Sequence, residues 1–271
     1  MIPAPARIAF GVDGIEAVHS LASNDLACNT PHSPPTTIAQ VRAGSQVTFH
    51  WSKWLYSHKG PLTAWMAPYA GDISKVNVST LPFFKIADDT MDKNGDWGTV
   101  SMRDKTNGTY TVTIPADLAP GTYVMRQEII GIHFAVLVPK KIQWYNKLGL
   151  EFYPLCINLN VTGTGTAKPG GVNFPGAYDA KDAAFHYNIY ANNTPPTPIP
   201  PLGPNVYKSA ITIQLDPKPI VEISPTGNGS QADAQYFAMQ NQNLTKIAQV
   251  IEYFDYIDSM ACLDASDCVP S

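Results

Sequence analysis

Residues 46–51 read Gln-Val-Thr-Phe-His-Trp, and this alternation of polar and apolar side chains predicts a β-strand. Successive side chains of an extended strand point to opposite faces, so the Val, Phe and Trp share one face. The same alternation returns in residues 110–114 and 157–161. Three such stretches indicate a sheet with one face turned toward a hydrophobic core.

Turn-forming residues separate these stretches. They are Lys59-Gly60-Pro61, Asn94-Gly95, Asn107-Gly108 and Ala119-Pro120-Gly121. Short alternating strands divided by such turns are typical of a β-sandwich or a β-barrel. We therefore expect an all-β body.

The charge balance and hydropathy exclude two classes of partner. The net charge is −4 and no cluster of Lys and Arg occurs, so we expect no nucleic-acid binding. The longest apolar stretch, residues 129–138, is too short to cross a bilayer and is interrupted by His133. We therefore expect no membrane span.

Several features indicate a secreted, extracellular protein. The four cysteines are even in number and form no C-x-x-C pattern, which favours disulfides in an oxidising compartment. Residues 1–7 contain no signal-peptide pattern, so we expect the signal to lie outside this sequence. The N-x-Ser/Thr glycosylation candidates are Asn77, Asn107, Asn160, Asn192, Asn228 and Asn243.

The chain changes character after a proline-rich segment at residues 194–204. Between residues 232 and 260 the apolar side chains recur at helical spacing without Pro or Gly, which predicts a C-terminal amphipathic helix. Residues 231–271 contain one Lys and six Asp or Glu, a net charge of −5. We therefore divide the chain into a sandwich at 1–207, a linker at 208–230 and an acidic helical extension at 231–271. The extension is either a solvated appendage or a docking segment for a partner.

Eight fragments, in order and spacing, carry a family resemblance. They are Ser23–Asn29, Ser57–Pro61, Phe83–Ile86, Gly95–Gly98, Leu118–Arg126, Glu128–His133, Glu151–Cys156 and Phe174–Tyr178. Over about residues 21–207 the chain resembles auxiliary activity family 9, the fungal copper lytic polysaccharide monooxygenases. The resemblance implies an antiparallel immunoglobulin/fibronectin-III-like β-sandwich with long loops.

The resemblance also implies a copper site. In this family an N-terminal His supplies its amine and its ring nitrogen, a second His supplies a third nitrogen, and a Tyr lies in the axial position. By motif, His58 resembles the second histidine and Tyr153 the axial tyrosine. His133 resembles the histidine beside the bound oxidant, and Glu151 stands where the family usually has Gln. Nitrogen ligands in a planar arrangement suit Cu(II).

Each of these residues also has a simpler interpretation. His58 lies in a Gly-Pro loop, where a histidine is usually only a surface residue. Tyr153 could pack around a disulfide, and His133 could be a core histidine at the end of an apolar run. Glu151 carries a charge and lacks the amide donor of Gln, so the family role transfers to it least directly.

The sequence departs from the family pattern in three places. The chain opens with Met1, so the N-terminal His ligand is absent and the strand that presents it is expected to be missing. Residues 134–150 are longer and more apolar than the family's loop, and they are either an insertion or retained non-coding sequence. Some family members carry Arg in place of the N-terminal His, and Glu151 would suit such a cation.

The resemblance implies a disulfide between Cys28 and Cys156, which leaves Cys262 and Cys268 to pair locally. It also implies a monomer that cleaves cellulose or a related β-glucan with copper and an external reductant. Because half of the histidine brace is absent, we expect a polypeptide of this sequence to bind copper weakly and to release no oxidised oligosaccharides. The alternatives are a copper-free cell-wall or glycan-binding protein on the same fold, or a defective gene model.

Overall fold

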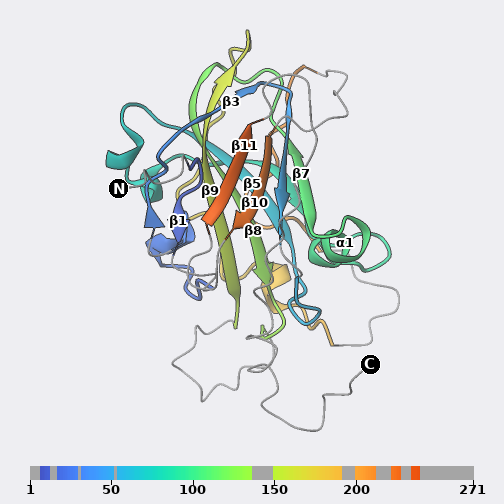
Figure 1. Cartoon of the computed structure of the whole chain (residues 1–271). Coiled ribbons are helices and arrows are strands. Elements are labelled where there is room, and N and C mark those ends of the chain that lie inside the picture. Colours follow the sequence, from blue (N-terminus) through green and yellow to red (C-terminus); the bar gives the residue numbers. More distant parts are fainter. Residues whose placement is uncertain are drawn as a thin grey trace.

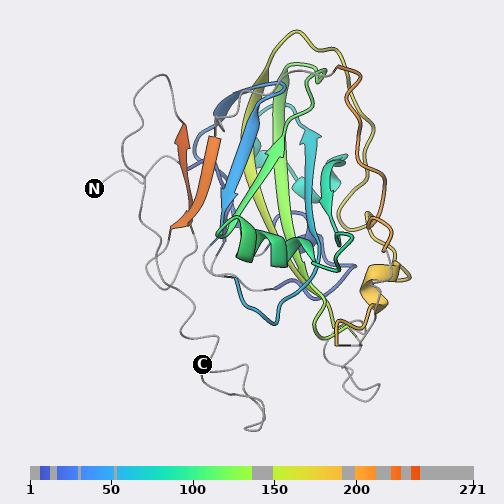
Figure 2. The ribbon, with the colours of Figure 1, turned by 90° about the vertical axis from the view of Figure 1, so that its right-hand side faces the viewer.

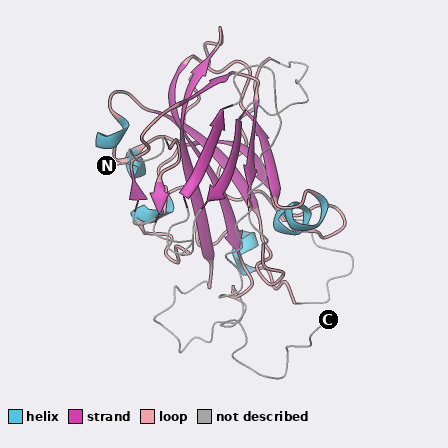
Figure 3. Cartoon of the chain, viewed as in Figure 1, coloured by secondary structure: helices cyan, strands magenta, loops and turns pink. Residues whose placement is uncertain are grey.

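The structure is a computed structural model of the chain. It describes residues 7–12, 17–29, 32–51, 54–135, 149–190, 199–211, 221–226 and 233–238. Short helices lie at the periphery of the sheets (Figure 3). They are the α-helix α1 (Gly98–Lys105) and the 3₁₀ helices η1 (Asn24–Leu26), η2 (Ile73–Lys75), η3 (Val78–Thr80) and η4 (Ala183–His186). No helix among the described residues has the length and hydropathy needed to cross a membrane.

Two larger sheets form a β-sandwich (Figure 1), which confirms the predicted fold class. The five-stranded sheet has the order β3 (Ala39–Arg42), β9 (Glu151–Thr162), β8 (Gly121–Gly131), β5 (Leu62–Pro68), β6 (Phe84–Asp89). The four-stranded sheet has the order β11 (Asp233–Ala238), β10 (Val221–Thr226), β4 (Gln46–His50), β7 (Thr109–Thr113). A small third sheet pairs β1 (Gly11–Val12) with β2 (His32–Ser33).

The three alternating stretches of the sequence are strands, as predicted. Strands β4 and β7 pair antiparallel, with Val47 opposite Val112 and Phe49 opposite Tyr110. All four side chains are buried in one core cluster that also includes inward-facing residues of β8 and β9. The alternation therefore marks the faces of two strands that close one side of the core.

The five-stranded sheet is buried on both faces, because loops cover the face that points away from the other sheet. Along β5, Met66 packs in the cluster between the sheets, whereas its neighbour Trp65 packs in a second cluster on the outer face. In Figure 2 the segment that follows β9 runs along this outer face. Strands covered on both sides lose the simple alternation of a half-exposed strand.

A buried ion pair connects the outer face to the segment before β2. Arg126 and Glu128 are both fully buried and bonded to each other. The Arg126 Nε atom also donates to the Leu26 carbonyl at 3.0 Å, and Tyr178 donates to Glu128. Cys28 and Cys156 form the disulfide that the family resemblance implies. Since Cys156 lies opposite Arg126 in the β8–β9 register, the ion pair and the disulfide hold the same segment.

An N-terminal segment lies along one edge of β9. The Phe10 backbone N–H donates to the Cys156 carbonyl at 3.0 Å, and the Asn158 N–H donates to the Ile8 carbonyl at 2.9 Å. Ile8 and Ala9 are fully buried. The residues before Ser23 thus contact β9 through isolated bridges, and the absence of the family's first strand stays a prediction.

The C-terminal prediction was wrong where the structure describes that part of the chain. Residues 233–238, predicted to begin a helix, are strand β11, and the expected linker contains strand β10. Strand β10 pairs with β11 and runs parallel to β4, so the hairpin extends the four-stranded sheet (Figure 2). Over six residues, hydrogen bonding to a neighbouring strand overrides a helical spacing. The rest of the predicted helix lies outside the described residues.

Candidate functional site

The pairing of β8 with β9 brings three of the predicted site residues to one end of the sandwich. Gly131, the last residue of β8, lies opposite Glu151, the first residue of β9. His133 follows Gly131 by two residues. Tyr153 lies two residues after Glu151 and therefore shares its face of the sheet. These residues are neighbours because of strand register, although 18 positions separate His133 from Glu151 in the sequence.

The loop that carries His58 is fixed against the end of β8. The Ile132 N–H donates to the Lys59 carbonyl, and the Ile130 N–H donates to the Pro61 carbonyl, both at 3.0 Å. A side chain on Gly60 would place its Cβ 1.8 Å from the Ile130 carbonyl oxygen, so this close approach requires glycine. The Gly-Pro turn therefore sets the position of His58 relative to His133.

Two residues that the sequence did not reveal as site residues orient His58. The Trp54 indole donates to the His58 carbonyl at 2.9 Å, and its ring packs edge-on against Tyr153 with centroids 5.2 Å apart. The Ser57 hydroxyl lies 2.9 Å from the Nδ1 atom of His58. A tryptophan four positions before a histidine is only a weak signal, because its role depends on how the loop folds back.

The Glu151 carboxylate is the centre of the cluster. Its Oε2 atom accepts a hydrogen bond from the Tyr153 hydroxyl at 2.7 Å. The same oxygen lies 3.3 Å from the His58 Nε2 atom and 3.7 Å from the His133 Nε2 atom. The two imidazole rings lie 4.0 Å apart, centroid to centroid. The structure thus brings together His58, His133, Glu151 and Tyr153, the four residues that the resemblance singled out.

Burial and charge set the protonation of this cluster. Burial lowers the pKa of His133 to about 4, with a further contribution from His58 and an opposing one from Glu151. Burial alone would raise the pKa of Glu151, but the bond from His58, the two imidazoles and the Tyr153 hydroxyl outweigh it and hold this pKa at about 2. At neutral pH the site therefore contains an ionised carboxylate beside a neutral His133.

The donor set fits a divalent metal ion of the copper or zinc kind. His58, His133 and Glu151 each offer one ligand atom, and these three atoms all lie within 4.8 Å of one another. Both ring nitrogens of His133 are buried without a hydrogen-bond partner among the described residues. Buried polar atoms normally have partners, and imidazole nitrogens suit copper and zinc. An ion between these residues would supply a partner for one of the two His133 nitrogens.

The remaining predicted residues lie away from this site or outside the described residues. Asn77 and Asn107 are exposed, and the Asn160 amide donates to Gln40 at 2.7 Å on the sheet edge. Glycosylation of these positions stays a prediction. Asn192, Asn228, Asn243, Cys262 and Cys268 lie outside the described residues, as do residues 136–148 of the expected insertion.

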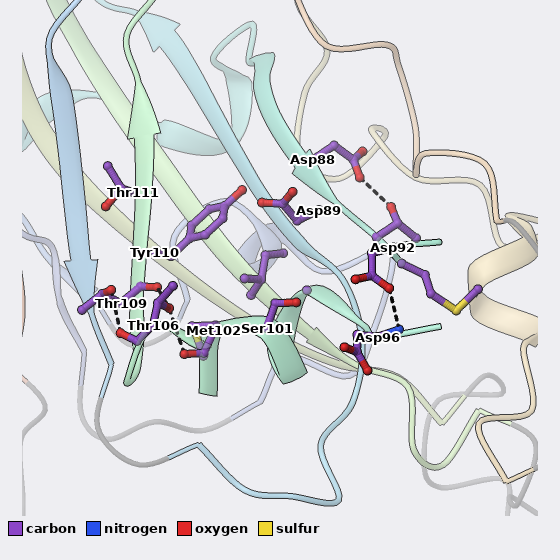
Figure 4. Close-up of a pocket in the computed structure, with 14 residues that line it drawn as sticks. Asp88, Asp89, Asp92, Asp96, Ser101, Met102, Thr106, Thr109, Tyr110 and Thr111 are labelled. Atoms are coloured by element: carbon purple, nitrogen blue, oxygen red, sulfur yellow. Dashed lines mark hydrogen bonds between the residues drawn. The ribbon is translucent and has the colours of Figure 1, made fainter. Parts of the chain in front are cut away.

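A separate acidic cavity of about 420 Å³ lies beside β6 and α1 (Figure 4). Asp88, which lines it, is bonded to the buried Lys85. In Figure 4 the Asp89 carboxylate and the Tyr110 hydroxyl point toward each other. Burial raises the pKa of Asp89, against the effect of Tyr110. The acidic groups of this cavity are thus engaged by residues of the chain itself, and the cavity is not the site that the sequence predicted.

The fold and the site together define a β-sandwich protein with two histidines, a glutamate and a tyrosine clustered at one end of its larger sheet. A family model for Auxiliary Activity family 9 (formerly GH61) matches residues 5–198. The chain belongs to this family, whose members are copper enzymes that act on polysaccharides.

Individual relatives agree with this assignment. The chain is 40% identical over 212 residues to AA9 family lytic polysaccharide monooxygenase A of Geotrichum candidum, with 76% of this chain and 68% of the relative covered. Monooxygenase B of the same organism is 38% identical over 242 residues, with 87% and 59% covered. The solved extended catalytic domain of H. jecorina LPMO9A, also called EG4, superposes with a TM-score of 0.65 at 27% identity, with 87% and 90% covered. The chain thus spans about three fifths to two thirds of these two Geotrichum relatives.

Proposed function

We propose that this protein takes part in the copper-dependent oxidative cleavage of cellulose or a related β-glucan. The observation that carries the proposal is the convergence of His58, His133, Glu151 and Tyr153 at one end of a family 9 sandwich. Copper, when bound, would supply the redox chemistry that activates the oxidant. The proposal includes a secreted monomer that receives electrons from an external reductant.

Each residue of the site would have its own role around the ion. His58 would bind it through Nε2, and Tyr153 would lie beside it. His133 would hold a hydrogen bond beside the oxidant. Glu151 would hold the Tyr153 hydroxyl, to which it is bonded at 2.7 Å. Trp54 would keep both His58 and Tyr153 in place through its two contacts.

A groove next to the site supports a carbohydrate as the substrate. It has a volume of about 410 Å³ and includes Tyr56 and Lys59, which flank His58 in the sequence. The Tyr56 side chain is 70% exposed, and the Arg103 guanidinium lies 4.5 Å from its ring centroid. Exposed aromatic rings beside polar groups suit sugars, which present both C–H surfaces and hydroxyls.

The printed sequence supplies one imidazole of the family's brace, His58. Without an N-terminal His, His58 should hold copper more weakly than an intact brace does and should support little oxidation. The test therefore compares this polypeptide with a chimera in which residues 1–22 are replaced by the N-terminal segment of a family member that begins with His.

We expect the chimera to bind one copper ion tightly and to release C1- or C4-oxidised oligosaccharides from swollen cellulose with ascorbate, as detected by mass spectrometry. His58→Ala in the chimera should abolish both results. A folded chimera that binds cellulose but neither binds copper nor oxidises the polymer would overturn the proposal. That outcome would favour a copper-free glycan-binding protein instead.

A further inference from the structure

The least satisfied polar group at the site is the imidazole of His133. Its side chain is only 3% exposed, and neither ring nitrogen has a hydrogen-bond partner among the described residues. Leaving such a group unpaired in the interior is unfavourable. The ring lies against His58 on one side, and its Nε2 atom faces the Glu151 carboxylate at 3.7 Å. A further group is therefore expected between these three residues.

The spacing of the three side chains matches the requirements of a tetrahedral ion. Ligand atoms at about 2.0–2.1 Å from a tetrahedral zinc ion are roughly 3.3 Å apart. The two distances from Glu151 Oε2 to the imidazole nitrogens are 3.3 and 3.7 Å, and all three ligand atoms lie within 4.8 Å of one another. Small rotations of the side chains would close this triangle around an ion.

Neighbouring groups already hold two of the ligands in place. The Ser57 hydroxyl lies 2.9 Å from the Nδ1 atom of His58 and can accept a hydrogen bond from Nδ1–H, which leaves the Nε2 lone pair to bind an ion. The Tyr153 hydroxyl donates to Glu151 at 2.7 Å. The His58 side chain is 12% exposed, so the fourth position of the ion can be reached from solvent.

We propose that His58, His133 and Glu151 of this chain bind one divalent ion of the zinc class as direct ligands, without any N-terminal group. Two histidines and a glutamate with an open fourth position form a zinc-binding set, whereas a brace needs three nitrogens. The inference shares His58 with the proposed function and rests on the same end of the sandwich. It assigns His133 and Glu151 a different role, because both become ligands of the ion instead of its neighbours.

The test uses the full printed chain without an affinity tag. Zn²⁺ binding is measured by isothermal titration calorimetry, and Co²⁺ is added as a visible probe whose absorption reports tetrahedral coordination. We expect one ion per chain. Glu151→Gln and His133→Gln should each weaken Zn²⁺ binding by more than about 100-fold, the upper end of what the loss of a supporting partner costs. His186→Ala is the matched control, since His186 is exposed and bonded to the Ala180 carbonyl, and it should leave binding unchanged.

Glu151→Gln is nearly isosteric, and a cooperative thermal transition of this variant would show that it folds. Zn²⁺ binding that persists in both site variants, or no stoichiometric binding by the parent chain, would overturn the inference. A failure of this inference can be distinguished from a failure of the proposed function. The chimera with an N-terminal His should keep tight copper binding when Glu151 is replaced by Gln, whereas the printed chain should lose zinc.

Discussion

Glu128 and Glu151 lie on paired strands of one sheet, and each accepts a hydrogen bond from a tyrosine, yet their surroundings differ. Glu128 is fully buried and bonded to Arg126, so a cation of the chain itself compensates its charge. Glu151 faces His58 and His133 at the rim of the sandwich. A buried carboxylate paired with a guanidinium therefore supports the fold, whereas a carboxylate surrounded by imidazoles is still able to bind a metal ion.

Removing the Arg126 guanidinium should have the largest effect on stability. Arg126→Met leaves Glu128 buried without its partner and should lower the free energy of unfolding by about 3–5 kcal/mol. Glu151→Gln, which removes the charge of the other carboxylate, should cost less, about 1–3 kcal/mol, because Gln keeps the side-chain volume and loses only the charge that faces the two imidazoles. Urea denaturation of both variants measures this difference. Equal losses would mean that the two glutamates have the same structural role.

The disulfide should contribute to the stability of the fold and not to metal binding. Replacing Cys28 and Cys156 by Ala should cost about 2–5 kcal/mol, since the bridge closes a long loop next to Arg126. Zn²⁺ should raise the melting temperature of the parent and of this variant by the same amount. A variant that no longer responds to Zn²⁺ would show that the bridge also shapes the metal site.

The pH dependence of metal-free protein should come in part from the site. In the folded state the pKa of His133 is about 4, below its usual 6.5, so the unfolded chain binds more protons between these values. Stability should therefore fall as the pH decreases from about 6.5 to about 4, by on the order of 2–3 kcal/mol. The Glu151 pKa of about 2 adds a further loss below pH 4.5. The free energy of unfolding is measured by urea denaturation at each pH, with EDTA present to remove metal ions. Between pH 6.5 and 4 it should depend less on pH in His133→Gln than in the parent, and an unchanged dependence would contradict this assignment.

Sequence patterns predicted the strands that have one clear apolar face. The strands at residues 46–51 and 110–114 could be predicted because the pairing of β4 with β7 buries alternate side chains. The hairpin of β10 and β11 could not be predicted from the sequence. Strand β10 lies within the expected linker, and β11 covers only the first turns of the helical pattern, which are too short to exclude a strand. Strand pairing over such distances is a tertiary effect that local spacing does not contain.

Motifs singled out the candidate site residues, whereas their arrangement could not be predicted from the sequence. Family fragments singled out His58, His133, Glu151 and Tyr153, but the distances to Glu151 depend on the register that places Gly131 opposite Glu151. The contact of Trp54 with both His58 and Tyr153 depends on a loop that folds back. Register and loop closure are decided by the whole sheet, so they become visible only in the structure.

The measurement that tests the metal site most directly is a zinc titration followed by ¹H–¹⁵N spectra of the histidine rings. The chain has six histidines, and single replacements of His58 and His133 would assign the two signals of interest. We predict that both ring signals change together and reach saturation at one equivalent of Zn²⁺, while the signal of His186 does not change. Glu151→Gln should remove this response. Ring signals of His58 and His133 that stay unchanged, or that change equally in Glu151→Gln, would contradict a site built from these three residues.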